Sequence, residues 1–347
     1  MAEFVRPVPS WDARAQAQLD TLLTAEGIRR DGHLDYSCGI FDEDDGLIAT
    51  GSCYGPTLRC LAVDHRHQGE GLLNQIVGHL IQVQLERGNT HLFVYTKPAA
   101  ARQIGDLGFY EIARVGRELV FLENRPAGFS RFLSSLKKGT APAERTAAIV
   151  MNANPFTLGH RHLVERASRE NDTVHLFLLS EDAGPIPHTV RRKLVEAGIR
   201  DLGNVILQET DCYLISSATF PSYFLKDGDQ ATRAQAELDT AVFAKIAACL
   251  GIGRRYVGEE PSSHVTALYN TVLKRELPKH GIRCVEIPRL AVAGRTVSAS
   301  TVRQAIHDGR LEDARELVPE STYRFFAGAE GASVRAAIQR EEHVIHE

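Results

Sequence analysis

The sequence predicts an α/β protein with two domains, the second of which is built on a parallel sheet. Its 347 residues and 43% apolar content are sufficient for two cores of ordinary size. Proline, glycine and charges of both signs gather between residues 123 and 145, a composition typical of a connector. We therefore expect a boundary near Gly139, with domains that cover residues 1–138 and 139–347.

Beyond the connector, strand-like and helix-like patterns alternate. The expected strands cover residues 146–151, 173–179, 204–208, 254–258 and 283–287, and the expected helices cover 159–170, 188–201, 232–250 and 264–275. This alternation predicts a parallel sheet with helices on both faces, and such sheets bind ligands at the carboxyl ends of their strands. Residues 129–138 are expected to form one short connector helix, and residues 330–347 either a helix or a frayed tail.

Composition argues against several function classes. The formal net charge of −4 gives no reason to expect a nucleic-acid partner or attraction to an acidic membrane surface. No segment has the uninterrupted apolar run of a signal peptide or membrane span, so we expect a cytoplasmic protein. The six cysteines form no C-x-x-C pair and are expected to be reduced thiols. The histidines lack metal-binding spacing, and no metal site is predicted.

A phosphate-binding turn is predicted at the end of the strand at 146–151. The segment MNANPFTLGHRHLVERA, residues 151–167, runs from that strand through an Asn/Pro turn into a helix that starts near Gly159. A helix N-terminus carries unsatisfied N–H groups and a positive dipole end, which favour phosphate. Gly159 permits close approach of phosphate, while the Thr157 hydroxyl and the His160 imidazole are potential donors. In the alternative interpretation Thr157 only caps the helix, and Gly159 and His160 have no role.

A second segment, VSASTVR at residues 297–303, also stands directly before a predicted helix. The two segments together resemble the signatures of the nucleotidyltransferase superfamily, H/T-x-G-H and I-S-x-S/T-x-x-R. This resemblance implies a Rossmann-like domain that binds ATP, with Mg²⁺ accompanying the substrate, and that transfers an adenylyl group. It implies catalytic roles for Thr157, His160 and Arg303. Thr157 stands where many members have histidine, which removes a potential cationic contact.

The residues expected to bind ATP come from these two segments and from VGEEP, residues 257–261, which follows another predicted strand. They are Asn152, Asn154, Pro155, Phe156, Gly159, Gly258, Glu259, Ser298, Ser300 and Thr301. For Gly258 and Glu259 a solvated acidic loop is an equally good interpretation. We expect Mg²⁺ to be carried by the substrate because no dedicated carboxylate cage is visible.

The first domain contains a glycine turn of a different kind. Arg66, Gly69 and Gly71 match R-x-x-G-x-G at the start of an amphipathic helix, and LGFYE follows at residues 107–111. Backbone N–H groups in such a turn suit a pyrophosphate. The pair of segments looks like the acyl-CoA-binding part of a GNAT acetyltransferase, which implies a GNAT-like domain that holds a CoA-like group. Tyr110 is either a general acid or a core residue.

The combination of an adenylylating domain with a CoA-like site suggests an acid–thiol ligase, because an acyl adenylate is open to attack by a thiolate. Four segments, MNANPFTLGHRHLVERA, YLISSATFPSYFLK (213–226), RRYVGEEPSSHVTALYN (254–270) and VSASTVR, closely resemble the citrate lyase ligase family. The resemblance implies that ATP, acetate and the thiol form of citrate lyase give AMP, pyrophosphate and acetylated lyase. The acceptor it implies is a phosphoribosyl-dephospho-CoA arm on the acyl carrier subunit of the lyase, bound at Arg66, Gly69 and Gly71.

Several alternatives stay open at this point. Ser216, Ser217 and Phe220 are candidates for an acetate pocket, or they belong to an ordinary packed loop. The chain is alternatively an adenylyltransferase that makes a dinucleotide-type cofactor, with a structural first domain. A third interpretation is a non-catalytic sensor of acyl-CoA or nucleotide.

Overall fold

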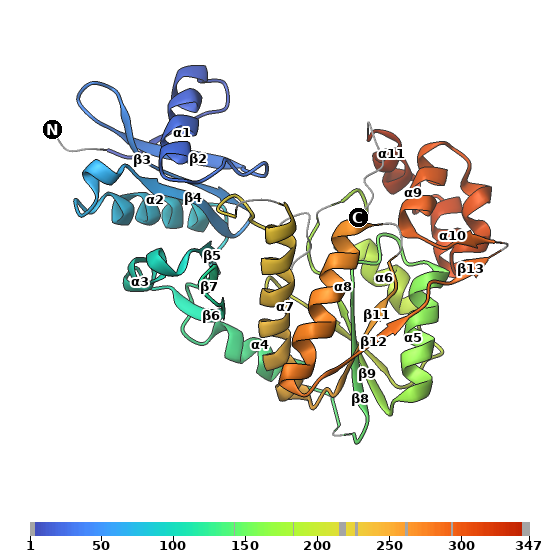
Figure 1. Ribbon diagram of the computed structural model, residues 1–347. Coiled ribbons are helices and arrows are strands. Elements are labelled where there is room, and N and C mark those ends of the chain that lie inside the picture. The colour runs from blue at the N-terminus through green and yellow to red at the C-terminus, as the bar shows by residue number, and fades with distance from the viewer. Residues whose placement is uncertain are drawn as a thin grey trace. The chain divides into compact units, whose positions relative to one another are not determined.

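The computed structural model describes residues 4–141, 143–182, 184–214, 220–225, 228–260, 263–292 and 294–341 (Figure 1). The chain divides into two compact units. Unit 1 comprises Met1–Phe132 and Pro221–Ala234, and unit 2 comprises Leu133–Phe220 and Gln235–Glu347. Residues 221–234 return to unit 1 through contacts that are distant in sequence. The backbone N–H of Arg29 donates to the carbonyl of Tyr223 at 2.8 Å. The guanidinium of Arg29 donates to the carbonyl of Leu225 at 3.1 Å.

Unit 1 is built on a seven-stranded sheet in the order β1-β2-β3-β4-β5-β7-β6, in which only the β4–β5 neighbours are parallel. The strands are β1 (Arg6–Pro7), β2 (Tyr36–Phe41), β3 (Leu47–Tyr54), β4 (Thr57–Val63), β5 (Phe93–Thr96), β6 (Tyr110–Val115) and β7 (Leu119–Glu123). The helices are α1 (Ala13–Ala25), η1 (His65–His67), α2 (Leu72–Glu86), α3 (Pro98–Asp106) and α4 (Gly128–Leu136), the last of which continues into unit 2. Strand β3 is buried along most of its length because α1 and α2 both contact it.

Unit 2 contains a five-stranded sheet in the order β10-β9-β8-β11-β12, and every neighbouring pair is parallel. The strands are β8 (Thr146–Met151), β9 (Thr173–Leu178), β10 (Val205–Glu209), β11 (Arg254–Gly258) and β12 (Arg283–Ile287), and a small hairpin is formed by β13 (Ala291–Val292) and β14 (Arg295–Thr296). The helices are α5 (Leu158–Glu170), α6 (His188–Gly198), α7 (Gly228–Leu250), α8 (His264–Glu276), η2 (Leu277–His280), α9 (Ala299–His307), η3 (Leu311–Leu317), α10 (Glu320–Ala327) and α11 (Ala332–Gln339). Helix α7 begins in unit 1, to which its residues up to Ala234 belong. The prediction of an α/β protein with a parallel second sheet is confirmed, as is the short connector helix, here α4.

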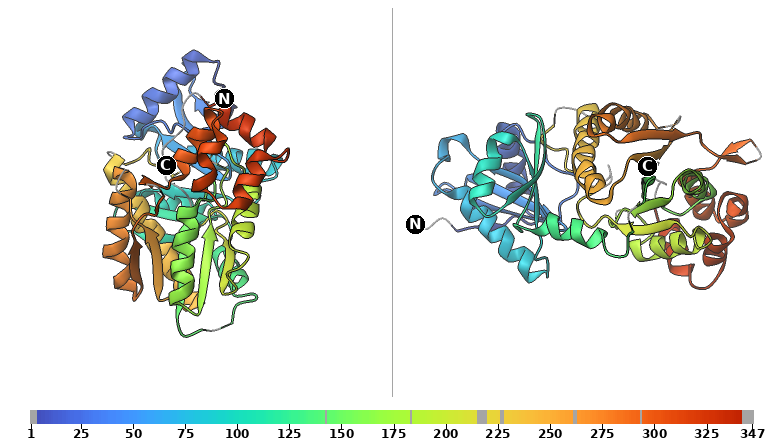
Figure 2. Two further views of the ribbon diagram at one scale, coloured as in Figure 1. Left: turned by 90° about the vertical axis from the view of Figure 1, so that its right-hand side faces the viewer. Right: turned by 90° about the horizontal axis from the view of Figure 1, so that it is seen from below.

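The strand order of unit 2 explains how its helices are distributed. Helices α5 and α6 connect β8 to β9 and β9 to β10 in one direction along the sheet, whereas α7 and α8 lead to β11 and β12 in the other. Because parallel crossovers are right-handed, the two pairs cover opposite faces, as Figures 1 and 2 show. All five strands end at one edge of the sheet, and the chain switches direction between β8 and β11, which is where such sheets bind ligands.

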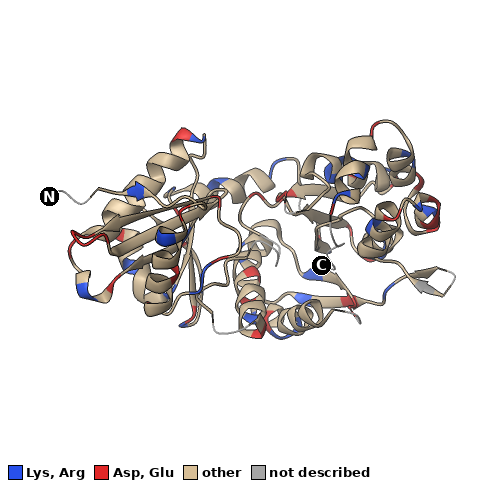
Figure 3. Ribbon diagram, turned by 90° about the horizontal axis from the view of Figure 1, so that it is seen from above, with Lys and Arg blue, Asp and Glu red and all other residues tan. Residues whose placement is uncertain are grey.

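Charged residues of both signs are mixed on the helices of both units, as Figure 3 shows. The six cysteines are free thiols, as expected. Three of them, Cys38, Cys53 and Cys60, are buried in unit 1, where burial raises the pKa of each thiol to about 12. Among the described helices, none combines the length and apolar character that crossing a bilayer requires.

Candidate functional site

A cavity of about 560 Å³ lies at the carboxyl edge of the parallel sheet in unit 2. Its wall is formed by the ends of β8, β11 and β12 and by the first residues of α5, α8 and α9. The predicted residues on this wall are Asn152, Thr157, Gly159, His160, Gly258, Glu259, Ser298, Ser300 and Thr301. The fold therefore brings three segments together that are far apart in the sequence.

The start of α5 is closed by a reciprocal pair of hydrogen bonds between Thr157 and His160. The Thr157 hydroxyl oxygen accepts from the backbone N–H of His160 at 3.3 Å, and Nδ1 of His160 accepts from the backbone N–H of Thr157 at 3.1 Å. Thr157 is thus a helix cap, as in the simpler interpretation of the sequence. His160 also takes part in this cap, so it is not a bystander.

The cap determines which nitrogen of His160 carries the proton. A backbone N–H can only donate, so Nδ1 is unprotonated, and the Thr157 hydroxyl, 2.9 Å from Nδ1, donates to it as well. The proton of the neutral ring is therefore on Nε2. Burial, together with the positive charge of Arg289, lowers the pKa of His160 to about 4. Near neutral pH the side chain presents a neutral Nε2–H donor on the cavity wall, without a cationic charge.

Three helix N-termini open onto this one cavity. Their caps are Thr157 for α5, Ser263 for α8 and Ser298 for α9, and all three line the wall. The Ser263 hydroxyl accepts from the backbone N–H of Thr266 at 3.3 Å, and that of Ser298 accepts from Thr301 at 3.1 Å. The N-terminus of a helix carries a partial positive charge and N–H groups that its own turns cannot satisfy, so three such ends around one cavity favour a polyanion.

Gly159 is required for the close approach of the two predicted segments. A β-carbon at this position would lie 3.3 Å from the carbonyl oxygen of Val297, which is tighter than ordinary contact. The first turn of α5 and the residue before the cap of α9 therefore touch. This contact explains the glycine on structural grounds, beside any approach of phosphate.

Four of the predicted residues lie away from the cavity wall. Asn154, Pro155 and Phe156 are buried, and the ring of Phe156 packs on Gly198 of α6, where a β-carbon would come within 2.4 Å of the ring. Arg303 is 2% exposed, and its guanidinium donates to the carbonyl of Asn154. In this arrangement Arg303 joins the two segments, and its role as a phosphate ligand stays a prediction.

The proposed acetate pocket falls largely on Ser216 and Ser217, which lie outside the described residues. Phe220 is buried in unit 2 and does not line the cavity formed by the described residues. Its role therefore stays a prediction.

The cavity wall also contains residues that the sequence analysis did not identify. Arg289 follows β12, and its Nε donates to the carbonyl of Glu259 at 2.9 Å while Nη2 pairs with the carboxylate of Glu260. His162, on α5, lines the wall as well. The sequence could have marked Arg289 as a candidate, because it follows a predicted strand of the parallel sheet, and the ends of such strands form the ligand-binding edge.

The glycine turn of unit 1 has the backbone that its sequence predicts. Gly69 and Gly71 have φ angles of 91° and 78°, and Gly71 caps α2. A β-carbon at either position would meet no atom within 4 Å, so the turn is open and the glycines are required by conformation alone. The Arg66 guanidinium pairs with Asp64 at 2.7 Å and is largely exposed. Tyr110 is 47% exposed, which argues against a core position.

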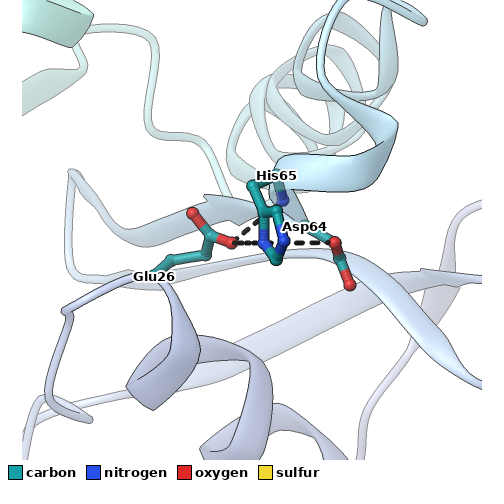
Figure 4. A group of neighbouring side chains, drawn as sticks. All are labelled: Glu26, Asp64 and His65. Atoms are coloured by element: carbon teal, nitrogen blue, oxygen red, sulfur yellow. Dashed lines mark hydrogen bonds and ion pairs between the residues drawn. The ribbon is translucent and has the colours of Figure 1, made fainter.

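Near this turn, Glu26, Asp64 and His65 form a compact group, shown in Figure 4. Nδ1 of His65 lies 3.3 Å from Glu26 Oε1 and 3.6 Å from Asp64 Oδ1. Both carboxylate oxygens of Asp64 accept hydrogen bonds from Arg66, at 3.0 and 2.7 Å, so that carboxylate is already neutralised. The prediction that His65 binds no metal stays a prediction.

Comparison with known proteins identifies relatives over most of the chain. Residues 146–326 match the family model described as citrate lyase ligase C-terminal domain. A citrate (pro-3S)-lyase ligase of Haemophilus influenzae is 34% identical over 322 residues, which cover 91% of this chain and 96% of that protein. A protein of the same name from Klebsiella pneumoniae is 38% identical over 284 residues, which cover 80% and 83% of the two chains.

Two solved structures each resemble part of the chain. Pantothenate synthetase from Thermus thermophilus is 18% identical, covers 61% of this chain and 79% of its own, and superposes with a TM-score of 0.36. An acyl-CoA N-acyltransferase from Pseudomonas aeruginosa is 12% identical, covers 36% of this chain and all of its own, and gives a TM-score of 0.31.

Proposed function

The chain belongs to the citrate lyase ligase family and is an enzyme, and we propose that it uses ATP to acetylate the thiol prosthetic group of citrate lyase. The overall reaction converts ATP, acetate and the thiol into AMP, pyrophosphate and the acetyl thioester. The observation that carries this proposal is the convergence of three capped helix N-termini and the Nε2–H donor of His160 on one cavity.

The cavity is suited to the triphosphate of ATP. The N–H groups at the starts of α5, α8 and α9 are donors to phosphate oxygens, and His160 adds a neutral donor that remains in place at neutral pH. The hydroxyl groups of Ser300 and Thr301 lie on the same wall, within the first turn of α9. The nucleotide therefore has donors on several sides.

In the first step, an oxygen of the acetate carboxylate attacks the α-phosphorus of ATP. The bond from that phosphorus to the β-phosphate oxygen breaks, and pyrophosphate leaves with the electron pair, which gives acetyl adenylate. Negative charge develops on the α-phosphate and on the leaving group, and donors already in position stabilise it without reorganisation. His160 and the N-terminus of α5 are assigned to the transferring group, and Ser298 and Ser300 to the leaving pyrophosphate.

Mg²⁺ is expected to enter with the triphosphate, whose negative charge it would partly neutralise. At the cavity the carboxylates of Glu259 and Glu260 are the acidic groups, and Glu260 already pairs with Arg289. Among the described residues, the group of three or more potential metal ligands lies in unit 1 and not at this cavity. This donor set fits a metal ion held mainly by phosphate oxygens.

In the second step, the thiolate of the prosthetic group attacks the carbonyl carbon of acetyl adenylate. The bond from that carbon to the phosphate oxygen breaks, and AMP leaves. The acceptor thiol belongs to a CoA-like arm on the acyl carrier subunit, and we assign the pyrophosphate of this arm to the open turn at Arg66, Gly69 and Gly71. The open space beside both glycines supports this assignment.

The test is to incubate the protein with ATP, Mg²⁺ and acetate, with and without deacetylated citrate lyase. We expect acetate-dependent exchange of pyrophosphate into ATP in both cases, and release of AMP with recovery of lyase activity when the lyase is present. AMP found covalently in a product would favour the dinucleotide-forming adenylyltransferase. Binding of ATP with no exchange and no AMP release would favour a sensor.

A further inference from the structure

Arg289 is a cation on the shared wall of two neighbouring cavities. It lines the cavity described above and a second one of about 550 Å³, which also includes Arg283 and Arg166. Among the described residues on the wall of the first cavity, Arg289 is the one Lys or Arg side chain. It stands two residues beyond the end of β12, and its hydrogen bond to the carbonyl of Glu259 links it to the residue that follows β11.

The hydrogen bonds of Arg289 leave part of its guanidinium available. Nε donates to the Glu259 carbonyl at 2.9 Å and Nη2 to the Glu260 carboxylate, whereas Nη1 has no hydrogen-bond partner among the residues that the structure describes. The side chain is 26% exposed, and that of Glu260 is 6% exposed. The guanidinium is thus anchored on one side and open on the other.

Arg289 and His160 lie on the wall of the same cavity. Its positive charge contributes to the lowered pKa of His160, so the two side chains are electrostatic neighbours. His160 stands at the N-terminus of α5, where phosphate is favoured. A planar guanidinium beside such a site can bind phosphate oxygens through two parallel hydrogen bonds.

The carboxylate of Glu260 pairs with Arg289 at the wall of this cavity. A carboxylate on the wall of a cavity for a polyanion would repel the ligand unless a cation compensated its charge. The pair with Arg289 supplies that compensation, and the Glu260 carboxylate in turn holds the guanidinium beside the cavity. When a phosphate competes for the guanidinium, the pair needs only to loosen at Nη2, because the bond to the Glu259 carbonyl can persist.

We propose that Arg289 binds the phosphates of the nucleotide and that Glu260 is the positioning residue that holds its guanidinium at the cavity wall. This inference rests on the proposed function, because it takes the ligand of the cavity to be ATP. It assigns the positive charge that binds phosphate in this cavity to Arg289, which lies outside the two predicted phosphate-binding segments, residues 151–167 and 297–303. Arg303, by contrast, is buried against the Asn154 carbonyl.

The test compares binding of ATP, pyrophosphate and adenosine by titration calorimetry in Arg289→Gln, Glu260→Gln and the double variant. Loss of an anchored charged hydrogen bond should weaken binding of ATP and of pyrophosphate by about 10- to 100-fold in Arg289→Gln. Adenosine, which lacks phosphate, should bind within about twofold of the wild type. Glu260→Gln keeps an oxygen that can accept from Arg289 but removes the charged pair that holds the guanidinium, so it should weaken ATP binding by less than Arg289→Gln does.

The double variant controls for a folding defect in Arg289→Gln. That single variant leaves the buried carboxylate of Glu260 without its cation, which can destabilise the fold. In the double variant both charges are absent, and thermal unfolding should stay near that of the wild type while ATP binding remains weak. Arg283→Gln, which replaces an exposed arginine on β12 that lines only the second cavity, is the matched control and should bind ATP normally.

Two results would overturn the inference while leaving the proposed function intact. One is a folded double variant that binds ATP and pyrophosphate as the wild type does. The other is a loss in Glu260→Gln as large as that in Arg289→Gln, which would assign the effect to the carboxylate. If the wild type itself shows neither ATP binding nor pyrophosphate exchange, the proposed function fails instead.

Discussion

At the scale of single residues, His160 has two tasks that a substitution can separate. Its Nδ1 belongs to the cap of α5, and its Nε2 is available to a ligand on the cavity wall. In His160→Ala we expect acetate-dependent pyrophosphate exchange to fall by ~10²–10³, because a donor at the developing charge is lost. Loss of the cap bond should cost only about 1 kcal/mol of unfolding free energy, measured by denaturant titration. A folded variant with normal exchange would exclude the catalytic role.

The pH dependence of His160 follows from its depressed pKa. Burial and Arg289 favour the neutral ring in the folded state, and the pKa of His160 is lowered to about 4. Since the unfolded chain binds the proton more tightly, protonation destabilises the fold as pH falls from the ordinary histidine range toward about 4. Above that range the neutral donor is fully populated.

We expect Arg289→Gln to raise the pKa of His160, because it removes a positive charge that opposes protonation. The ring resonances of His160, followed by NMR as pH is lowered, would report this change directly. An unchanged titration in a folded variant would mean that the two side chains are not electrostatically coupled.

At the scale of elements, the N-terminus of α9 distinguishes capping from ligand binding. Ser298→Ala removes the acceptor for the Thr301 N–H and should cost about 1 kcal/mol of stability. Ser298→Asp restores a good cap but adds a negative charge to the cavity wall. We therefore expect the aspartate variant to unfold near the wild-type temperature and to bind ATP much more weakly than the alanine variant. Equal ATP affinities in these two variants would show that phosphate does not approach this helix end.

The strands and helix caps show how much of the fold and of the site could be predicted from the sequence. Strands β8, β11 and β12 have the predicted bounds. Only β8 is a buried apolar run, whereas β11 and β12 are short mixed segments that stand between helical patterns. The caps Thr157 and Ser298 were recognisable because each stands directly before a helical pattern. Arg289 was not identified although it follows a predicted strand, and Ser263 was not identified although it directly precedes a predicted helix. The sequence pattern does not reveal which strands become neighbours, so it could not show that both residues lie beside the turn at residues 151–160. That order, with β11 and β12 beside β8, is fixed only by tertiary packing.

At the scale of the whole molecule, the two units have separate cores, and the two proposed binding sites, for ATP and for the acceptor arm, lie in different units. The sequence pattern did not predict that a segment of the second half of the chain belongs to unit 1. Residues 221–234 belong to it through contacts such as those from Arg29 to the carbonyls of Ser222 and Leu225, at 3.2 and 3.1 Å. Domain limits of 1–138 and 139–347 stay a prediction, and a fragment ending at residue 138 would lack these contacts.

The separation of the two reactions gives the last prediction. Replacing Gly69 and Gly71 by alanine forces an L residue to adopt φ angles near 91° and 78°, although each added methyl group has open space. The turn should then distort, and its N–H groups should no longer receive the pyrophosphate of the acceptor arm. We expect acetate-dependent ATP–pyrophosphate exchange to survive in this variant while acetylation of citrate lyase fails.

His160→Ala should behave differently from the turn variant and lose both reactions. Without acetyl adenylate, the thiol has no substrate to attack. Gly78→Ala serves as the control within unit 1, since Gly78 lies inside α2 with no atom within 4 Å of an added β-carbon and should lose neither reaction. Both reactions should be measured in all three variants, with circular dichroism to verify the fold. If the turn variant, still folded, loses exchange and acetylation to the same extent, unit 1 is not a separate acceptor site, because a defect confined to the thiol step cannot slow the formation of acetyl adenylate.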